Sequence, residues 1–537
     1  MPRERGLRPA ARRLLHDGRL LRLPGGDRRH WQPPGLPDAA ARRHGGGDAA
    51  RPAGAGAVSA PPPGEAAPRD AYDIVVVGAG PAGLSAAAVA AGQGASVLLL
   101  DEGMGPGGQI YRGIANPALP DRRILGADYW KGEALLRAFA ASGAAYHPCA
   151  AVWHLDAARR VGFSREGRAH LVQAGQVVLA TGALERPFPV AGWTLPGVLS
   201  AGAAQTLLKA QGLAATGRVV LAGCGPLLWL LASQLVAAGR PPALLLDTTP
   251  AGNWRHALPH LPGFLASPYA RKGLALMARV RRAVPVIGGV TDLAIEGEAR
   301  AGRVTYRRGG AAPAGLPVDH VLLHQGVTPN LNLAAAAGCA LDWEPVQACF
   351  QPRTDAWGLT TRPGIWLAGD GAGIAGAEAA AARGSLAGLA AVAALGRIDA
   401  ATRDRLAAAP RAALARHRRG RAFLDRLYRP AGHFRRAADA ALACRCEEVT
   451  GATLREAAER LQVPGPNQMK AFLRCGMGPC QGRLCGLTVT ETIAAARRLS
   501  PAEIGYYNLR SPVKPLTLGE LASLPHDEAD LRATGGA

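Results

Sequence analysis

Residues 72–102 read YDIVVVGAGPAGLSAAAVAAGQGASVLLLDE, and this stretch decides the fold. It begins with the apolar residues Tyr72 and 74–77, which predict a parallel strand buried on both faces. The pattern Gly-x-Gly-x-x-Gly follows and opens an Ala-rich segment, residues 81–91, that predicts a helix. A second apolar run, residues 97–100, predicts the next strand and ends in two acids. Strand, glycines, helix, strand and acid in this order predict a dinucleotide-binding βαβ unit in an α/β protein.

Each part of this unit has a physical role in holding a dinucleotide. Gly78, Gly80 and Gly83 allow a tight turn, a close approach of the backbone to a pyrophosphate, and close packing of helix on strand. The helix N-terminus offers free N–H groups and the positive end of its dipole to the phosphates. A ribose hydroxyl is expected to bond to an acid at the strand end: Asp101 by spacing, or Glu102 by comparison with the internal repeat. The alternative is a coincidence in an Ala- and Gly-rich chain.

A second copy of the pattern begins near residue 218. Gly223, Gly225 and Asp247 correspond to the first two glycines and to the acid, but Leu228 replaces the third glycine. Without that glycine the helix cannot lie as close to its strand. A second Rossmann unit is therefore predicted. Two alternatives stay open for it: the unit binds NAD, or it is kept only for packing. If a nucleotide binds, Asp247 without a neighbouring Arg favours NAD over NADP.

Three further residues favour FAD as the first nucleotide. Gly107, Gly108 and Gln109 follow the ribose-binding acid closely, and the glycine pair lets the backbone pass close to a cofactor. In flavoproteins with two dinucleotide domains that cofactor is FAD. The chain also shows no close cysteine pair before Cys444, which makes thiol–disulfide catalysis a poor interpretation.

Two later apolar runs, residues 318–323 and 364–367, predict strands with which the chain returns to the first domain. The second runs into Asp370, ahead of an Ala-rich helix over residues 375–394. A carboxylate at this place matches the residue that binds the ribityl chain of FAD, and a plain helix N-cap is the alternative. His324 and Gln325, which follow the first of these strands, are assigned no chemistry.

Five of the nine cysteines lie in the last fifth of the chain, which argues for a reducing compartment rather than a secreted disulfide framework. Four of them, Cys444, Cys446, Cys475 and Cys480, form C-x-C and C-x4-C on predicted turns between short helices. Four thiolates on loops suit a [2Fe–2S] cluster. Zinc and unligated thiols are the alternatives, although structural zinc sites usually show two C-x2-4-C knuckles. Cys485 is expected to be a bystander.

Helices in this module are predicted from local signals. The sequence Thr453-x-x-Glu456 predicts a capping box that starts a helix near residue 454. Residues 468–473 are expected to end another helix, and a third is expected from Gln481 onward. This third helix would place the Cys480 thiolate near a helix N-terminus.

Charge and hydropathy argue against two other classes of protein, nucleic-acid-binding proteins and transmembrane proteins. The formal net charge is +22, but it is concentrated in residues 1–70 and 401–440 without interleaved aromatics, so no nucleic-acid partner is expected. Two charge-free stretches, residues 74–100 and 219–239, are long enough to resemble membrane spans. Both contain a glycine-rich turn and are better explained as buried α/β cores, so no transmembrane segment is predicted.

These observations divide the chain into seven parts. They are a disordered extension or misassigned start (1–70), a first FAD segment (71–215), an NAD(P)-binding-like domain (216–317), a second FAD segment (318–398), an Arg-rich helical linker (399–440), a [2Fe–2S] module (441–510) and a tail (511–537).

Three runs of sequence carry a resemblance to a known family: residues 473–482 (LRCGMGPCQG), 191–198 (AGWTLPGV) and 106–112 (PGGQIYR). Together they resemble the FAD-containing A subunits of opine oxidases, the B subunit of hydrogen cyanide synthase, and the α subunits of proline and hydroxyproline dehydrogenases and of sarcosine oxidase. The resemblance covers residues 71–510. It implies a flavoprotein of the pyridine nucleotide-disulfide reductase type with a C-terminal ferredoxin-like [2Fe–2S] module. It also implies a second flavoprotein subunit that oxidises the substrate, with or without a small ferredoxin-like subunit.

The leading hypothesis is an electron-transferring subunit of an amine or amino-acid (opine-, hydroxyproline- or glycine-like) dehydrogenase or oxidase. Electrons would pass through FAD and the cluster to a quinone or another acceptor. The location expected is cytoplasmic, including peripheral association with the inner membrane through the partners. The alternatives are a self-sufficient NAD(P)H:acceptor flavin oxidoreductase and a non-catalytic, zinc-binding assembly scaffold.

Overall fold

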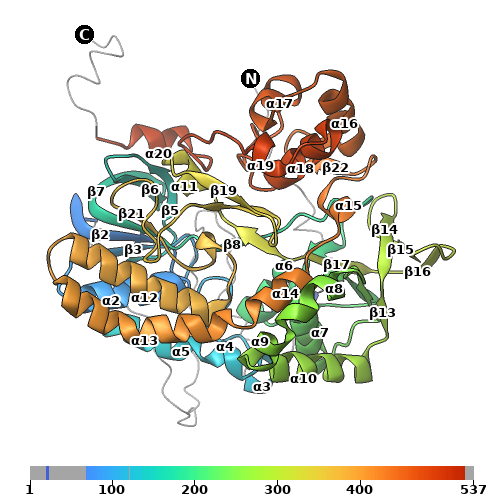
Figure 1. The fold of residues 1–537 in the computed structure, drawn as a ribbon, viewed down its shortest axis with the longest axis horizontal. Helices are drawn as coiled ribbons and strands as arrows, with labels where there is room; N and C mark the ends of the chain where they lie inside the picture. Colours follow the sequence, from blue (N-terminus) through green and yellow to red (C-terminus); the bar gives the residue numbers. More distant parts are fainter. Residues whose placement is uncertain (1–19, 23–67, 120, 526–537) are drawn as a thin grey trace, which may run out of the picture.

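The computed structural model describes residues 20–22, 68–119 and 121–525. Two sheets, the first mixed and the second all parallel, each with helices on one face, form the body of the protein, and a helical lobe follows near the C-terminus (Figure 1). The expectations for residues 1–70 and for the end of the tail lie outside the described residues, except for 20–22 and 68–70. Leu20–Arg22 (β1) pairs with Leu213–Ala215 (β10).

The first sheet is built on the opening stretch. Ala71–Val77 (β2) lies between Val97–Leu100 (β3) and Arg168–Leu179 (β7), parallel to both. The order is β4-β3-β2-β7-β6-β5, and Ile365–Leu367 (β21) also pairs with β7. The other members are Ala145–His147 (β4), Ala151–Leu155 (β5) and Arg160–Arg165 (β6).

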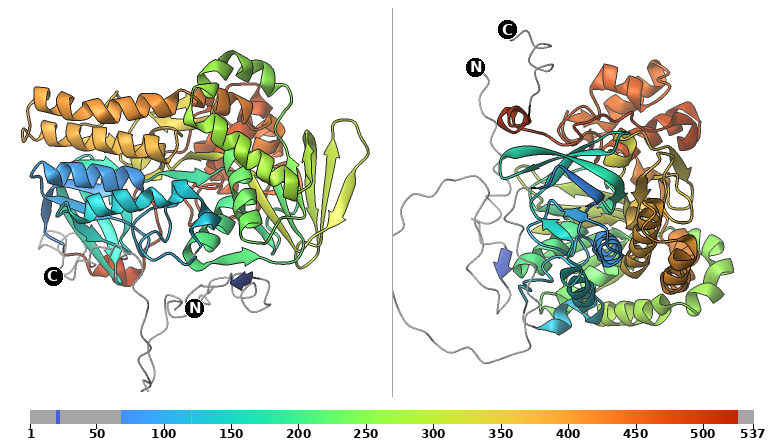
Figure 2. Two further views of the ribbon diagram at one scale, coloured as in Figure 1. Left: turned by 90° about the horizontal axis from the view of Figure 1, so that it is seen from below. Right: turned by 90° about the vertical axis from the view of Figure 1, so that its left-hand side faces the viewer.

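This sheet is buried on both faces, as the unbroken apolar run predicts. Ile74 and Val76 face a core with Pro81–Gly92 (α2) and Ala377–Ala394 (α12). The alternate residues Val75 and Val77 face a second core made with β5, β6 and β7. Figure 2 shows α2 and α12 side by side over the sheet, with Ala400–Arg418 (α13) packed against α12.

The second sheet has the order β13-β12-β11-β17-β9, all parallel. Its strands are Val286–Gly288 (β13), Leu244–Asp247 (β12), Val219–Cys224 (β11), His320–Gln325 (β17) and Val198–Ser200 (β9). Pro226–Ala237 (α7), Pro268–Ala283 (α10) and Ala201–Gln211 (α6) cover one face. An antiparallel sheet covers the other, made of Val290–Glu296 (β14), Arg303–Arg308 (β15) and Ala314–Pro317 (β16).

Two predicted domain boundaries are wrong. The strand over 318–323 was expected to return to the FAD domain, but β17 pairs with β11 over six residues and belongs to the second sheet. Strand β9, inside the predicted first FAD segment, pairs with β17. Any buried parallel strand is a short apolar run, so the run itself does not indicate which sheet it joins. The chain re-enters the first domain after Gln325.

The C-terminal lobe holds the cysteines and has its own core. It comprises Leu442–Cys444 (β22), Val449–Thr450 (β23), Gly451–Arg460 (α16), Pro466–Leu473 (α17), Gly486–Arg497 (α18) and Pro501–Ile504 (α19). Leu454, Met469 and Ile493 are fully buried between these helices. Leu518–Ala522 (α20) returns to β7 of the first sheet, where the Ser523 hydroxyl accepts a hydrogen bond from the Ala169 N–H.

Two helix starts in this lobe differ from the prediction. Helix α16 begins at Gly451 because the Thr450 hydroxyl, rather than that of Thr453, caps it and accepts from the Thr453 N–H. Helix α18 begins at Gly486 with Cys485 at its N-cap, so Cys480 does not lie at the helix N-terminus. Residues 481–485 form turns instead.

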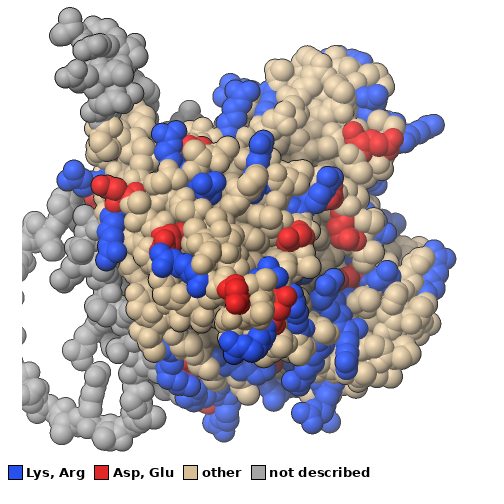
Figure 3. Space-filling model, turned by 60° about the vertical axis from the view of Figure 1, so that its left-hand side comes forward, with Lys and Arg blue, Asp and Glu red and all other residues tan. Residues whose placement is uncertain are grey.

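Lys and Arg outnumber Asp and Glu on the face shown in Figure 3, and the two signs are interspersed. No helix among the described residues is long and apolar enough to cross a membrane.

Candidate functional site

The first glycine loop leaves no room for side chains. A Cβ at Gly78, where φ is +106°, would lie 2.4 Å from the Ala180 carbonyl oxygen, and one at Gly83 would lie 1.7 Å from the Gly78 carbonyl oxygen. Gly80 is the N-cap of α2 and supplies no side-chain hydrogen bond to the first turn of that helix. The loop and the uncapped helix end line a large cavity. This arrangement fits the phosphates of a dinucleotide.

The loop around Gly107 and Gly108 lies directly against the first glycine loop. The Gly107 N–H donates to the Ala79 carbonyl at 2.8 Å, and a Cβ at Gly108 would come within 2.7 Å of the Gly80 Cα. Both glycines have positive φ. Gln109 follows and lines the cavity. The close contact that the glycine pair predicts is therefore made between two backbone loops beside the cavity.

The structure distinguishes the two candidate acids. The Asp101 carboxylate accepts from the Ala79 N–H at 2.5 Å and from the Gly103 N–H at 2.7 Å, and burial raises the pKa of this carboxyl. Glu102 is more exposed and pairs with Lys514. Both acids line the cavity, but Asp101 alone contacts the first glycine loop. Asp101 is therefore fixed by the backbone of the first glycine loop, whereas Glu102 is held by Lys514.

The second glycine loop packs against the strand that carries His324. Gly223 has φ +141°, and a Cβ there would lie 1.6 Å from the His324 carbonyl oxygen. At Gly225 a Cβ would lie 3.3 Å from Nε2 of the His324 ring. Leu228, at the position of the third glycine of the motif, is fully buried between α7 and the sheet. Asp247 ends β12, and its Oδ1 accepts from the Thr249 N–H and hydroxyl.

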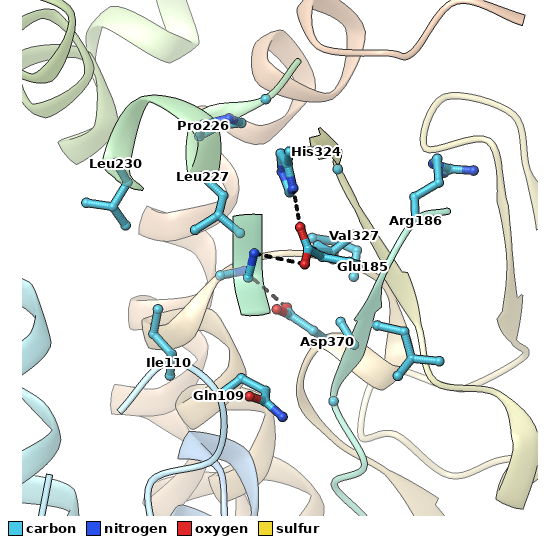
Figure 4. Close-up of a pocket in the computed structure, with 18 of the residues that line it drawn as sticks. Gln109, Ile110, Glu185, Arg186, Pro226, Leu227, Leu230, His324, Val327 and Asp370 are labelled. Atoms are coloured by element: carbon cyan, nitrogen blue, oxygen red, sulfur yellow. Dashed lines mark hydrogen bonds and ion pairs between the residues drawn. The ribbon is translucent and has the colours of Figure 1, made fainter. Parts of the chain in front are cut away.

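Asp370 fixes the turn ahead of α12 and also lines the cavity. It lies on the 3-10 turn Gly369–Ala372 (η2) ahead of α12, and its Oδ1 accepts from the N–H groups of Ala375 and Gly376 at 2.8 and 3.1 Å. It therefore orders the turn that leads into the helix. It also lines the cavity together with Gln109 (Figure 4).

One cavity of about 1970 Å³ joins the two glycine loops. Small-ligand sites usually measure about 300–1,000 Å³, so this space is large enough for more than one ligand. All the predicted nucleotide-site residues named above except the buried glycines Gly83, Gly107 and Gly223 line it.

A hydrogen-bonded pair of side chains, Glu185 and His324, lies in this cavity, and the sequence gives no indication of it. Nδ1 of His324 lies 2.7 Å from Oε1 of Glu185, and Glu185 Oε2 accepts from the Gly202 N–H at 2.8 Å. Glu185 is on the short strand Ala183–Glu185 (β8), and His324 is on β17 (Figure 4). The two residues are 139 positions apart, so only the fold brings them together.

A buried lysine also lines the cavity. Lys209 of α6 is 2% exposed, and its Nζ donates to Oε1 of Gln205 at 2.7 Å and to the Gln109 carbonyl at 3.2 Å. Burial lowers the pKa of Lys209 to about 7, with a further contribution from Arg112. A lysine in an amphipathic helix looks the same in sequence whether it is buried or exposed.

The structure brings all five C-terminal cysteines of the lobe together. Hydrogen bonds with the thiols of Cys475 and Cys485 lower the pKa of Cys444 to about 2. Burial raises the pKa of Cys446, whose thiol contacts Cys480. Cys485 thus lies beside Cys444 within the group, and the regular spacing of 475, 480 and 485 was the available signal for its nearness. All nine cysteines are free.

In the described parts of the chain no group of three or more His, Cys, Asp or Glu side chains is arranged as a metal site. The donor chemistry of the cluster nevertheless fits iron–sulfur ligation: four thiols lie on turns and the fifth, Cys444, ends β22, and three of the five are buried. Cys446 and Cys480 are partly exposed, so the group has an inner and an outer side.

A buried charge cluster connects the cavity wall to this lobe. Arg186 follows Glu185 at the end of β8, and its Nη1 lies 3.9 Å from Oε1 of Glu491 on α18. Glu491 also pairs with Arg435, and Arg186 donates to the Gln347 carbonyl at 2.8 Å. Arg186 and Glu491 are 5% and 6% exposed. The strand that carries Glu185 is therefore linked to the helix that begins after Cys485.

Comparison with known proteins shows the protein family to which this chain belongs. The family model for pyridine nucleotide-disulphide oxidoreductases matches residues 72–384, and the chain belongs to that family. The chain is therefore an oxidoreductase of a flavoprotein class. Within the class it belongs with the A subunits of opine oxidases: it is 52% identical to the opine oxidase A chain of Agrobacterium tumefaciens (strain Ach5), over 87% of this chain and 94% of that one.

More distant relatives extend the same group. The HcnB subunit of hydrogen cyanide synthase from Pseudomonas aeruginosa is 29% identical over 84% of this chain and 98% of its own length. The alpha subunit of sarcosine oxidase from Rhizobium meliloti (strain 1021) is 28% identical over 84% of this chain and 42% of its own length. Among solved structures, L-proline dehydrogenase from P. horikoshii shares the fold, with a TM-score of 0.63 at 19% identity over 84% of this chain and 79% of that one.

Proposed function

We propose that this chain is the electron-transferring flavoprotein subunit of a complex that oxidises an amine or amino-acid substrate at a C–N centre. The observation that carries the proposal is the cavity with a side-chain-free glycine loop at one end, in a chain whose C-terminal lobe gathers five thiols. The substrate class rests on the names of the relatives, which include opine oxidase and sarcosine oxidase.

The first nucleotide would be FAD. Gly78, Gly80 and the N-terminus of α2 would hold its pyrophosphate, Asp101 its ribose, and Asp370 its ribityl chain. Such a flavin supplies the step between a two-electron hydride donor and one-electron carriers. The backbone contact between Gly107 and Ala79 would hold the loop carrying Gln109 at the cofactor.

The cysteine lobe would hold a [2Fe–2S] cluster as the exit for electrons. Cys444, Cys446, Cys475 and Cys480 remain the proposed ligands, with Cys485 close enough to Cys444 to be considered beside them. The outer pair, Cys446 and Cys480, is the partly exposed side from which a quinone or another acceptor would take electrons.

Substrate oxidation is proposed to occur on a partner protein, because the relatives are named as subunits and the sequence shows no general-base constellation that points to a C–N substrate. The cytoplasmic location, with any membrane association through the partners, is part of the same proposal.

The division of labour is tested on the purified full chain. With FAD bound, it should reduce no dye when amines or amino acids are added, and NADH should not bleach its flavin, because Leu228 replaces the third glycine of the second motif and the His324 ring lies against Gly225. Amine-dependent dye reduction by the isolated chain would contradict the proposal. Rapid flavin bleaching by NADH would instead support a self-sufficient NAD(P)H:acceptor oxidoreductase.

A further inference from the structure

Lys209 is a buried amine in the cavity wall whose charge has no anionic partner. The residue is 2% exposed, yet it lines the cavity. Its Nζ donates to Oε1 of Gln205 at 2.7 Å and to the Gln109 carbonyl at 3.2 Å, so one of the three N–H groups of the ammonium remains. Both acceptors are neutral, and in the described part of the chain no carboxylate forms an ion pair with this amine. A buried ammonium without an anion is costly, so a ligand that brings negative charge would be favoured here.

A chain of side-chain amides orients the groups around this amine. Nε2 of Gln205 donates to Oε1 of Gln234 at 2.8 Å, and Nε2 of Gln234 donates to the Leu125 carbonyl at 3.2 Å. Because each amide nitrogen is committed to the next acceptor, Oε1 of Gln205 is the atom that faces Lys209. Both glutamines are buried. The wall therefore supports the protonated amine with dipoles but does not neutralise its charge.

A second cation lies on the same side of the cavity. Arg112 lines the cavity, and its Nε is buried without a hydrogen-bond partner in the described part of the chain. Its charge acts against that of Lys209. Asp101 and Glu102 interact with Arg112, but the Asp101 carboxylate is bonded to two backbone N–H groups and Glu102 pairs with Lys514. Neither acid therefore compensates the charge of the amine.

The amine lies beside the loop that meets the first glycine loop. Gln109, whose carbonyl accepts from Lys209, directly follows Gly108, and a Cβ at Gly108 would come within 2.7 Å of the Gly80 Cα. The Gln109 side chain and Asp370 lie in the same part of the cavity (Figure 4). Lys209 is thus next to the residues that would hold the pyrophosphate and the ribityl chain of FAD.

We propose that the ammonium of Lys209 is the counter-ion for the negative charge of the bound flavin nucleotide. This proposal rests on the proposed function. FAD brings negative charge from two sources: the pyrophosphate carries it at all times, and the ring carries it after two-electron reduction at neutral pH. The chemistry is the same for both, an anionic oxygen or nitrogen that accepts from the ammonium.

The test compares wild type with Lys209→Met, which keeps the length of the side chain and removes its charge. Dissociation constants for FAD and for riboflavin are measured by flavin fluorescence on full-length chains freed of flavin. If the pyrophosphate is the anion, Lys209→Met should weaken FAD binding about 10–100-fold, the range for a hydrogen bond to a charged group. Riboflavin has no phosphates and should bind equally to both proteins.

The midpoint potential of the bound flavin distinguishes the second source. If the reduced ring is the anion, oxidised FAD should bind equally to wild type and Lys209→Met, but the variant should have the lower potential. A tenfold loss of affinity for the reduced ring corresponds to about 30 mV for this two-electron couple.

The matched control is Lys272→Met. Lys272 also lines the cavity, but it is exposed and pairs with Asp128, so this variant should keep the wild-type dissociation constants and potential.

Wild-type FAD affinity together with a wild-type potential in folded Lys209→Met overturns the proposal. Equal weakening of FAD and riboflavin binding also overturns it, because the change then disturbs the shape of the cavity and not a contact between charges. The same loss in Lys272→Met would do so as well. If Lys209→Met does not fold, Lys209→Gln takes its place with the same outcomes. A folded wild-type chain that binds no FAD overturns the proposed function instead.

Discussion

At the residue scale, Gly83 shows how strictly the first loop is built. A methyl group there would lie 1.7 Å from the Gly78 carbonyl oxygen, and this backbone atom cannot move without disturbing the loop. We expect Gly83→Ala to lower the free energy of unfolding by about 1–3 kcal/mol and to abolish FAD retention. Thermal unfolding and flavin content after gel filtration measure both.

The matched control is Gly92→Ala at the other end of α2, where a Cβ would meet nothing within 4 Å. This change should leave FAD content unaltered and stability equal or slightly higher. Wild-type unfolding and full FAD content in Gly83→Ala would contradict the described packing of helix on strand.

Lys209 gives a prediction for pH. Its pKa is lowered by burial from 10.5 to about 7, so between these values the unfolded chain binds a proton that the folded protein does not. Stability should therefore rise with pH across this window, with a contribution of about 1.4 kcal/mol per pH unit, and the cost of burial should be fully present below pH 7. Urea unfolding of wild type and Lys209→Met at pH 7 and pH 9 should show this slope in wild type only. Equal slopes would contradict the buried amine.

Sequence reasoning succeeds where contacts are local. The contact between the strand-end acid Asp101 and the first glycine loop follows from the sequence because a turn, a helix end and a strand end lie within one βαβ unit. The pair of Glu185 and His324 could not be predicted, since their contact depends on how β8 and β17 are brought together. A lone Glu and a lone His have no periodicity that would mark them.

At the scale of elements, the C-terminal lobe is attached through buried charges. Glu491 lies between Arg186 and Arg435, and although burial raises the pKa of its carboxyl, the two guanidinium groups favour the ionised form. Removing one member of such a group leaves buried charges without a partner. We expect Glu491→Gln to cost about 3–5 kcal/mol and to make residues 441–510 more sensitive to protease.

The comparison is Glu456→Gln on α16, whose carboxylate lies 3.8 Å from Arg460 with both side chains exposed. Such a surface pair contributes about 0–1 kcal/mol, so this variant should be close to wild type. If Glu491→Gln unfolds and is cleaved like Glu456→Gln, the charge cluster does not fix the lobe.

The limits of strands and helices could be predicted better than the pairing of the strands into sheets. The limits of β2, β3 and α2 follow from apolar runs and glycines, but the sheet that contains β17 depends on pairing with β11, which no local pattern shows. Helix α16 starts at Gly451 because the Thr450 hydroxyl caps it, three residues before the threonine that the sequence suggested.

At the scale of the whole molecule, β8 connects the cavity between the two glycine loops to the cysteine lobe. Glu185 of β8 bonds to His324 in the cavity, Arg186 extends toward the lobe, and α18 begins where the thiols gather. The family assignment explains the two sheets.

The most direct measurement is the visible and electron paramagnetic resonance spectrum of the purified full chain, before and after reduction. The proposed function predicts flavin bands over a broad [2Fe–2S] absorption when oxidised, and a cluster signal after reduction that is lost when Cys444 and Cys475 are replaced by Ser while FAD remains. A colourless protein, or one with flavin but with zinc at the cysteines, would contradict it.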